Sequence, residues 1–263
     1  MTAFSTNSLR AALLVSAATL ATSVAHAAPA IGLAGGNTLV KFDTETLTVN
    51  GTMAVSGVDS LAGIDVRPAD MMLYGVSMAG DVVTIDTDTG VATVKSTLSE
   101  MLPSYEGAIV DFNPKADRLR LMSADGINHR VNVDDGMVTV DGSLAYEDAD
   151  MHAGEAPAIA AAAYTNSIGT PETTAMFDID TTIVALIQQV SPNDGTLGAI
   201  GKLGVDGGSS YGFDIKADAE LNNTAYLVID NTLHTVDLES GAATVVGAIE
   251  GVDGMLSDIA ILP

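Results

Sequence analysis

Three aspartates occupy matching positions in three similar segments, and carboxylates in such a pattern can bind a metal ion. Asp65 lies in GIDVRP, Asp111 in VDFNP and Asp214 in GFDIK. Carboxylate oxygens suit a hard cation such as Ca²⁺, which takes about six to eight oxygen ligands. Two further matching segments carry Ala163 and Ala260 instead. We treat the three aspartates as candidate Ca²⁺ ligands. The alternative is that each one hydrogen-bonds its own turn or a neighbouring strand.

The segment DRLRLMSADGINHRVNV predicts a β-hairpin that is rich in arginine for so acidic a chain. Its Ser-Ala-Asp-Gly turn at 123–126 places Arg120 opposite Arg130 and gives one apolar and one polar face. Two opposed arginines repel each other unless a negative group lies between them. That group is either an aspartate in a network between sheets or a bound phosphate, sulfate or carboxylate. The candidate anion ligands on the polar face are Arg118, Arg120, Asn128, Arg130 and Asn132.

Two other acidic segments are weaker candidates for metal or catalytic sites. Residues 86–90 (DTDTG) resemble a calcium loop but lack its third ligand and its terminal glutamate, so a strand turn is predicted. Residues 146–155 form an acidic connection that could bind a metal or supply an acid and a base, although a solvated charged loop is the commoner outcome. Its candidate side chains are Glu147, Asp148, Asp150, His152 and Glu155.

The remaining residues offer little for catalysis. The chain contains no cysteine and no G-x-S-x-G motif. His129 and His234 fall within predicted strands, which indicates structural roles. Aromatic residues make up only 4% of the chain, so stacking platforms for sugars are scarce. No recognisable catalytic set is present, and the sequence favours binding over catalysis.

Short alternating apolar runs separated by Asp-, Thr- and Gly-rich turns indicate the elements that position these residues. The aspartate segments recur at intervals of roughly fifty residues, a period typical of propeller blades. Each period holds four strands, the first of which carries the aspartate position. The fold class predicted is all-β, a five-bladed β-propeller.

The two ends of the chain supply parts of one blade. Residues 258–262 form only an inner strand, whereas residues 31–34 and 38–42 begin with second and third strands. Pairing of these N- and C-terminal strands would close the ring and remove open sheet edges. The alternative, a six-bladed ring, requires another unit between residues 140 and 172.

Residues 1–27 are predicted to be a signal peptide, with a short apolar run and an Ala-His-Ala cleavage pattern. Residues 28–263 then form one propeller domain, which we expect in the periplasm or outside the cell, as a monomer not inserted in a membrane. The formal net charge of −24 repels nucleic acid and anionic lipid. The absence of cysteine leaves stability to packing and topology.

Several segments resemble the bacterial secreted family known as domain of unknown function 4394. The resemblance rests on VDFNPKADRLRLMSADGINHRVN, VDGSLAY, AAAYTNS, SPNDGTLGAIGKLGVD and GFDI, and covers about residues 31–263. Ile127-Asn128 and Ser191-Pro192 depart from the Gln-Asn and Pro-Pro of some members. The resemblance implies the propeller fold and export. It brings no activity, cofactor or catalytic residue.

Taken together, these features predict an exported module that binds a small ligand or an extracellular partner, with a structural Ca²⁺ as a further expectation. The alternative is a metal-dependent hydrolase that works at the channel through Asp65, Asp111 and Asp214. A third interpretation is a cell-surface or matrix protein in which the ring is only a spacer.

Overall fold

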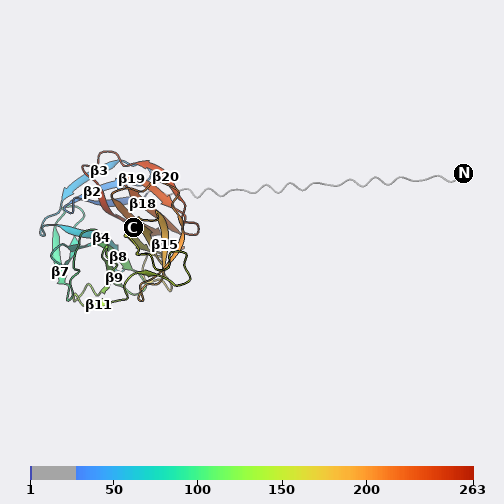
Figure 1. Cartoon of the computed structure of the whole chain (residues 1–263). Helices are drawn as coiled ribbons and strands as arrows, with labels where there is room; N and C mark the ends of the chain where they lie inside the picture. Colours follow the sequence, from blue (N-terminus) through green and yellow to red (C-terminus); the bar gives the residue numbers. More distant parts are fainter. Residues whose placement is uncertain (2–27) are drawn as a thin grey trace.

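The computed structural model describes Met1 and residues 28–263, and these residues form five β-sheets arranged as a ring (Figure 1). The predicted signal peptide falls almost wholly on residues 2–27, outside the described residues. The described residues contain no helix, and so they contain no helix that is long and apolar enough to cross a membrane. The predicted five-bladed propeller is confirmed.

Each blade is a sheet in which consecutive strands run antiparallel from the centre of the ring to its rim. Blade I contains β21 (Leu256–Ile261), β1 (Pro29–Ala34), β2 (Thr38–Asp43) and β3 (Val49–Ala54). Blade II contains β4 (Leu61–Arg67), β5 (Met72–Ser77), β6 (Asp81–Ile85) and β7 (Ala92–Thr97). Blade III contains β8 (Ile109–Asn113), β9 (Arg118–Met122), β10 (Asn128–Val131) and β11 (Val138–Val140). Blade IV contains β13 (Ile159–Tyr164), β14 (Met176–Asp180), β15 (Ala185–Ser191) and β16 (Thr196–Lys202), and blade V contains β17 (Tyr211–Ala217), β18 (Asn223–Ile229), β19 (Thr232–Val236) and β20 (Ala243–Ala248).

Blade I closes the ring by joining the two ends of the chain. The last strand, β21, pairs antiparallel with β1, so that Gly32 lies opposite Ile259 and Leu33 opposite Asp258. The predicted closure is therefore observed. The six-bladed alternative is wrong, because residues 140–172 add only the two-residue strand β12 (Ala145–Tyr146), which pairs parallel to the rim of blade IV.

The hydrophobic core is divided among the five interfaces between blades. One cluster joins Tyr74 of blade II to Phe112 and Leu119 of blade III, and a similar cluster fills each of the other four interfaces. Strands near the centre are covered by neighbours on both faces, and β4 and β8 are consequently buried along almost their whole length. Packing across the interfaces thus holds the inner strands in fixed positions around the axis.

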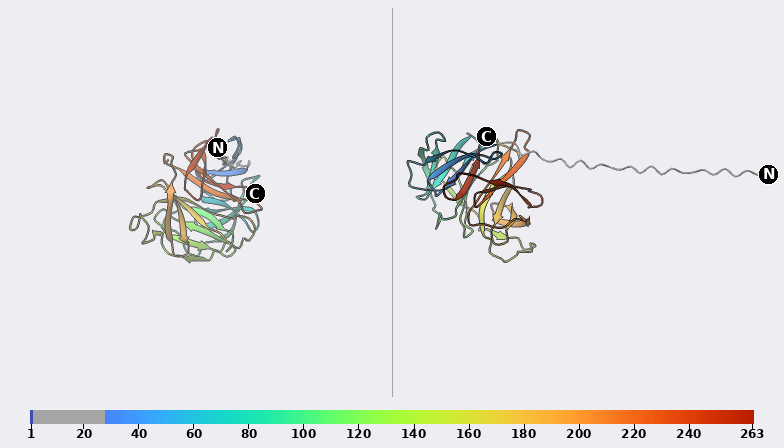
Figure 2. Two further views of the ribbon diagram at one scale, coloured as in Figure 1. Left: turned by 90° about the vertical axis from the view of Figure 1, so that its right-hand side faces the viewer. Right: turned by 90° about the horizontal axis from the view of Figure 1, so that it is seen from above.

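The two faces of the ring differ in the segments that they carry (Figures 1 and 2). We call the face at which the inner strands begin the upper face, and the face at which they end the lower face. The upper face carries the loops that enter the inner strands and the loops between the second and third strands of each blade. The lower face carries the turns that leave the inner strands, and the C-terminal end of the chain lies there at the centre of the ring (Figure 1).

The recurrent Asp–Gly turns connect the third and fourth strands, and each one contacts the blade before it. In residues 86–90 the Oδ1 of Asp86 accepts hydrogen bonds from Asp88 N (2.9 Å) and Thr89 N (2.8 Å), which forms the predicted strand turn. The equivalent Gly136 has φ +75°, and a Cβ there would overlap the carbonyl oxygen of Thr97 in blade II. Ser99 N also donates to Gly136 O (2.9 Å). These turns therefore tie each blade to the rim of the preceding one.

Candidate functional site

Asp65, Asp111 and Asp214 lie on the inner strands β4, β8 and β17, and the structure brings them together at the centre of the ring. One carboxylate oxygen from each lies within 4.8 Å of the others. All three side chains are buried. The three matching positions of the sequence therefore form one cluster, which we call the channel aspartates.

Each channel aspartate also accepts a hydrogen bond from the backbone of the next blade. Asp65 Oδ2 accepts from Phe112 N (2.7 Å), and Asp111 Oδ1 accepts from Tyr164 N (2.9 Å). Asp214 Oδ2 accepts from Ile261 N (2.5 Å). The alternative role considered from the sequence, bonding to a neighbouring strand, is thus present as well. The two roles are compatible, because a carboxylate oxygen has more than one lone pair.

A fourth carboxylate, Asp258, extends this pattern and was missed by the sequence reasoning. Its Oδ2 accepts from Ile64 N of blade II (2.8 Å), as the channel aspartates do in other blades. Asp258 precedes Ala260 by two residues, so it lies on the same side of its strand, one step towards the upper face. A Cβ at Gly63 would lie 2.9 Å from its Oδ2, which shows that the glycine provides the space for this carboxylate. The position of Asp258, two residues before the aligned Ala260, was the sequence signal that could have identified it.

Burial and mutual repulsion raise the pKa of these acids. Burial is the larger cause for Asp65, whose pKa is well above its usual value, and the charge of Asp214 adds to it. The pKa of Asp111 is raised in the same way by burial and then by the charge of Asp65. Burial raises the pKa of Asp214 to about 6 and that of Asp258 to about 8. The backbone N–H donors therefore only partly offset the cost of holding these charges away from water.

The arrangement of the channel aspartates fits a divalent cation. Two oxygen ligands at about 2.4 Å from a Ca²⁺ ion can lie up to about 4.8 Å apart, and the three carboxylates meet this limit. They would supply three of the ion's oxygens, and backbone carbonyls or water would supply the others. Ala163 and Ala260 contribute no side-chain ligand. The donor set is therefore oxygen-only, which favours Ca²⁺ over Zn²⁺.

A small cavity reaches Asp65 and Asp214 from the lower face. It has a volume of about 100 Å³, and Lys216, Ile168 and Pro263 are among the residues that line it. Lys216 Nζ donates to Leu262 O (3.1 Å), and its charge opposes the rise in the pKa of Asp214 without forming an ion pair with it. A cavity of this volume holds an ion with a few water molecules, and it excludes a sugar or nucleotide.

The arginine hairpin forms with the predicted register. Arg120 lies opposite Arg130, and the turn closes through Gly126 N donating to Ser123 O (2.9 Å). The carboxylate of Asp141 lies between the two arginines. Its Oδ2 is 2.7 Å from Arg120 Nη1, and its Oδ1 is 3.0 Å from Arg130 Nη2. An aspartate therefore supplies the negative charge that the opposed arginines require.

Arg120 joins blade III to blade IV through its other donors. It donates to Asn128 Oδ1 (2.7 Å), to Tyr164 OH (3.2 Å) and to Asn193 Oδ1 (3.2 Å). Asn128 in turn donates to Pro192 O (2.8 Å). These contacts describe the network between sheets that was one of the two interpretations of the hairpin.

Two of the five predicted anion ligands lie outside this network. Arg118 donates to the carbonyl of Asp117 (2.7 Å), and Asn132 Oδ1 accepts from Asp134 N (3.3 Å) in the strand turn. The structure thus brings together Arg120, Asn128 and Arg130 around Asp141. Anion binding at the hairpin stays a prediction from the sequence.

Comparison with known sequences places this architecture in a family. The profile described as "Domain of unknown function (DUF4394)" matches residues 38–260. The chain belongs to the DUF4394 family. A search of curated proteins finds no match.

Solved structures that match this DUF4394 domain do so at low sequence identity, and the first of the two below has a similar fold. A protein of unknown function from Bacteroides thetaiotaomicron VPI-5482 is 13% identical with a TM-score of 0.52, and the match covers 90% of this chain and 65% of that one. This chain thus spans less than two thirds of that protein. A protein of unknown function from Bacteroides caccae is 10% identical with a TM-score of 0.48, over 90% of this chain and 99% of that one.

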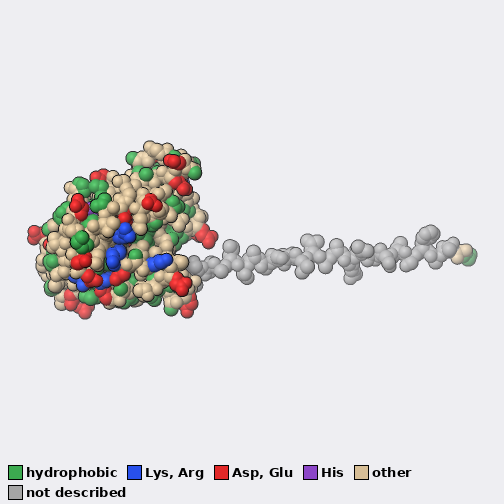
Figure 3. Space-filling view, turned by 90° about the horizontal axis from the view of Figure 1, so that it is seen from below, with side chains coloured by type: hydrophobic (Ala, Val, Ile, Leu, Met, Phe, Trp, Pro, Cys, Tyr) green, Lys and Arg blue, Asp and Glu red, His purple; other side chains and the backbone are tan. Residues whose placement is uncertain are grey.

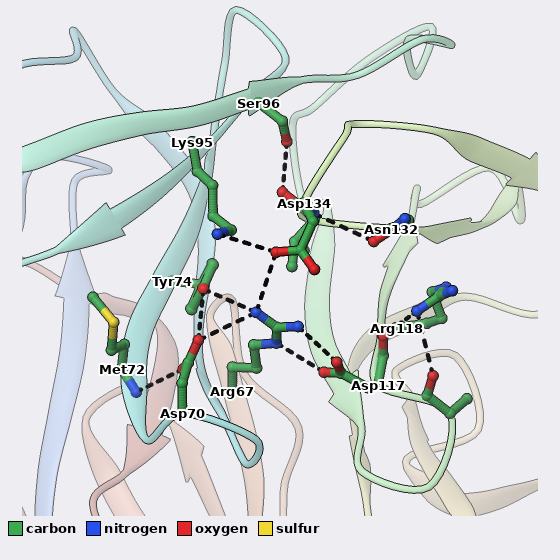
Figure 4. Close-up of polar contacts among 12 residues, drawn as sticks. Arg67, Asp70, Met72, Tyr74, Lys95, Ser96, Asp117, Arg118, Asn132 and Asp134 are labelled. Carbon is green, nitrogen blue, oxygen red and sulfur yellow. Dashed lines mark hydrogen bonds and ion pairs between the residues drawn. The ribbon is translucent and has the colours of Figure 1, made fainter.

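The lower face of the DUF4394 domain holds a second arginine network that sequence reasoning missed (Figure 4). Arg67 pairs with Asp117 of blade III, with Nη2 to Oδ2 at 2.6 Å and Nε to Oδ1 at 2.8 Å. It also contacts Asp70 (3.2 Å) and Asp134 (3.5 Å), and Asp134 pairs with Lys95 at 3.0 Å. The hydrogen bond from Arg67 lowers the pKa of Asp117. The network joins blades II and III on the lower face.

Figure 3 shows Lys and Arg side chains lying close together on one side of the domain, with Asp and Glu side chains among them. This mixture agrees with the ion pairs, since Lys41, Arg67 and Lys95 each pair with aspartate. Of the nine Lys and Arg side chains within residues 28–263, five form ion pairs with aspartates of the same chain.

The acidic connection at 146–155 forms contacts within itself and with β16 of blade IV. His152 Nδ1 lies 2.9 Å from Glu155 Oε2, and Asp150 Oδ2 accepts from Ala199 N (2.7 Å). Glu147 and Asp148 are exposed. Within residues 28–263, three or more acidic or His side chains converge tightly enough for a metal ion only at the channel aspartates.

Proposed function

We propose that this propeller is a non-catalytic binding module that holds a Ca²⁺ ion between Asp65, Asp111 and Asp214. The observation that carries the proposal is the convergence of three buried carboxylates within 4.8 Å. In the described part of the chain, no ion pair involves any of the three. Buried like charges without a counter-charge are costly, and a divalent cation would remove that cost.

The position of the site supports a structural role for the ion. The three aspartates belong to blades II, III and V and already hydrogen-bond to blades III, IV and I. A cation coordinated by all three would link inner strands from opposite sides of the ring. The exported propeller would thereby gain stability without disulfides, in a compartment where free Ca²⁺ suits sites of moderate affinity.

The test is thermal unfolding of residues 28–263 at pH 7.5, in EDTA and in a series of Ca²⁺ concentrations. We expect Ca²⁺ to raise the unfolding midpoint, because a ligand at about one hundred times its Kd stabilises the folded state by about 2.7 kcal/mol. Mg²⁺ should have a smaller effect, since it loses its water reluctantly. An unchanged midpoint at millimolar Ca²⁺ would refute the site.

A matched pair of variants separates this site from the general effect of an acidic surface. Asp111→Asn should abolish the Ca²⁺-dependent rise, because it removes one charged ligand. Asp88→Asn, at a carboxylate 91% exposed in a strand turn, should leave the rise intact. Equal effects of the two variants would show that Ca²⁺ only screens the surface charge.

The metal-dependent hydrolase is the second candidate. One observation favours it: burial raises the pKa of Asp214 to about 6, close to the range useful for acid–base catalysis. The small volume of the adjoining cavity argues against it. A screen with glycosides, phosphoesters and lactones tests this second candidate. Turnover by the wild-type protein that is lost in Asp111→Asn would favour the enzyme.

A further inference from the structure

A wide basin lies on the upper face of the ring, and none of the contacts above involves it. The basin has a volume of about 960 Å³. We call it the upper basin. Loops that enter the inner strands of blades I, II, III and V line it together with Ala160 of β13 in blade IV, so it lies over the axis of the ring.

Small side chains form the floor of the upper basin. Ala62, Ala108, Ala160 and Ser257 lie near the starts of four different inner strands. Because these side chains are short, the centre of the upper face is hollow rather than filled. The hollow is therefore built into the repeats themselves, at matching positions of several blades.

The walls of the upper basin combine apolar and acidic side chains. Met78 and Met255 are 45% and 49% exposed, and flexible Met side chains adapt to the shape of a bound partner. Glu106 and Asp253 are exposed carboxylates on the loops before β8 and β21. Among the described residues that line the basin, none is Lys, Arg or His. The lining thus offers apolar contact and negative charge together.

The rest of the upper face strengthens this charge. The loops on that face contain many Asp and Glu residues and not one Lys or Arg. These loops are 35–37, 55–60, 78–80, 98–108, 123–127, 141–158, 181–184, 203–210, 230–231 and 249–255. Cationic side chains from neighbouring strands reach these loops at two places among the described residues: Arg120 and Arg130 pair with Asp141, and Lys202 donates to the carbonyl of Ile183. The other carboxylates of these loops give the upper face an excess of negative charge that attracts cations.

We propose that the upper basin binds a basic peptide segment of a partner protein, in which Lys or Arg side chains alternate with aliphatic ones. The cationic groups would pair with Glu106 and Asp253, and the aliphatic groups would contact Met78 and Met255. An open basin of this volume accommodates several residues of an exposed chain. This inference extends the proposed binding role to a second site, and it does not depend on the Ca²⁺ site.

The probe is a short fluorescein-labelled peptide of alternating Lys and Leu, titrated with the protein in EDTA and followed by anisotropy. The matched peptide of alternating Glu and Leu should not bind. Because EDTA removes Ca²⁺, failure here leaves the Ca²⁺ proposal untouched, and failure of Ca²⁺ binding leaves this result untouched. Equal binding of both peptides, or of neither, overturns the proposal.

Charge reversal locates the site. The double variant Glu106→Lys/Asp253→Lys should raise the Kd for the Lys–Leu peptide at least tenfold. The control Glu45→Lys/Glu239→Lys makes the same change of net charge at exposed turns away from the upper face and should change the Kd less than threefold. An equal loss in both variants would show that the peptide only senses net charge, and would overturn the proposal.

A second readout requires no variant. With [¹³C-methyl]methionine, the Lys–Leu peptide should shift the methyl signals of Met78 and Met255 and leave those of Met72 and Met137, which lie outside the basin, unchanged. Spermidine serves as a small amine for comparison. If spermidine produced the same shifts at the same concentration of cationic groups, the ligand would be an amine rather than a peptide, contrary to the proposal.

Discussion

Two clusters of buried charge lie close to each other in this propeller, and they differ in how their charges are compensated. In the arginine hairpin, Asp141 lies between Arg120 and Arg130, and both its oxygens form ion pairs. At the axis, Asp65, Asp111 and Asp214 face one another, accept hydrogen bonds from backbone N–H groups and have no ion-pair partner among the described residues, although the charge of nearby Lys216 acts on Asp214. The first cluster is complete within the chain. The second has a charge deficit that a cation or protons must make up, and this difference separates a structural network from a candidate binding site.

The largest effect should follow from breaking the compensated cluster. Arg120→Met would leave Asp141, which is 5% exposed, with one partly exposed partner, and would remove donors from Asn128 and Tyr164. We expect the free energy of unfolding to fall by about 3–5 kcal/mol, because a buried charge loses its partner. Urea denaturation measures this change in the free energy of unfolding. Arg118→Ala, which removes a bond to a backbone carbonyl, is the control and should cost less than about 0.5 kcal/mol.

Asp178 is a further buried carboxylate with no ion-pair partner among the described residues. We place it with the channel aspartates in an uncompensated group, and we expect it to make stability depend on pH. It is fully buried in β14, where Gln189 Nε2 donates to it (2.9 Å), and burial raises its pKa to about 7. The folded state therefore binds more protons than the unfolded state between about pH 4 and 7. The contribution of Asp178 to stability is present at low pH and is lost as the pH rises through 7.

Between pH 5 and 8 this group should lower the free energy of unfolding by about 2 kcal/mol, since each unit of pKa shift corresponds to about 1.4 kcal/mol. Asp178→Asn should reduce the slope of that part of the pH profile in chemical unfolding measured in EDTA, and the channel aspartates and Asp258 should account for the slope that remains. Asp194→Asn, in an exposed turn, should not. A wild-type stability that increased over this range would contradict the assignment of Asp178 to the uncompensated group.

A smaller effect, with the opposite sign, should follow from removing one channel charge. Asn at position 111 keeps an oxygen acceptor for Tyr164 N and relieves the repulsion from Asp65. In EDTA at pH 8 we expect Asp111→Asn to raise the free energy of unfolding by up to about 1 kcal/mol. Asp141→Asn should lower it, because two arginines would then lose their counter-charge. If both variants destabilised the protein equally, the distinction between the two clusters would fail.

The smallest effect is expected at the exposed edge of the compensated cluster. The Arg130 side chain is 31% exposed, and Asp141 keeps Arg120 when Arg130 is removed. Arg130→Met should therefore cost less than about 1 kcal/mol in urea unfolding, as partly exposed ion pairs usually do. A cost as large as that of Arg120→Met would mean that both arginines are needed to hold Asp141.

The sequence predicts the parts of this molecule that repeat. The aspartate positions recur with the blade period, and residues at one position of successive inner strands face the same axis, so their convergence could be expected. The hairpin register followed from one short turn at 123–126, because a one-residue slip would expose the apolar face. Closure followed from counting strands at the two ends of the chain.

The features that the sequence reasoning missed depend on contacts without a fixed spacing. Asp258 lies two residues before the aligned position of its inner strand. A strict alignment therefore finds Ala260 and not the carboxylate that bonds to Ile64 N. The partners of Arg67 come from three different turns, Asp70, Asp117 and Asp134, that are far apart in the chain. The upper basin is formed by loops of unequal length, whose placement depends on the assembled ring.

The pairing of β21 with β1 also has a consequence for how the molecule is made. Ser257 donates to the carbonyl of Leu33, a contact between residues 224 positions apart. During synthesis, β21 leaves the ribosome after every other strand described here, so blade I lacks its innermost strand until then. Non-local pairing of this kind slows folding. A nascent chain that cannot complete blade I until its last strand has been made therefore stays incompletely folded for longer.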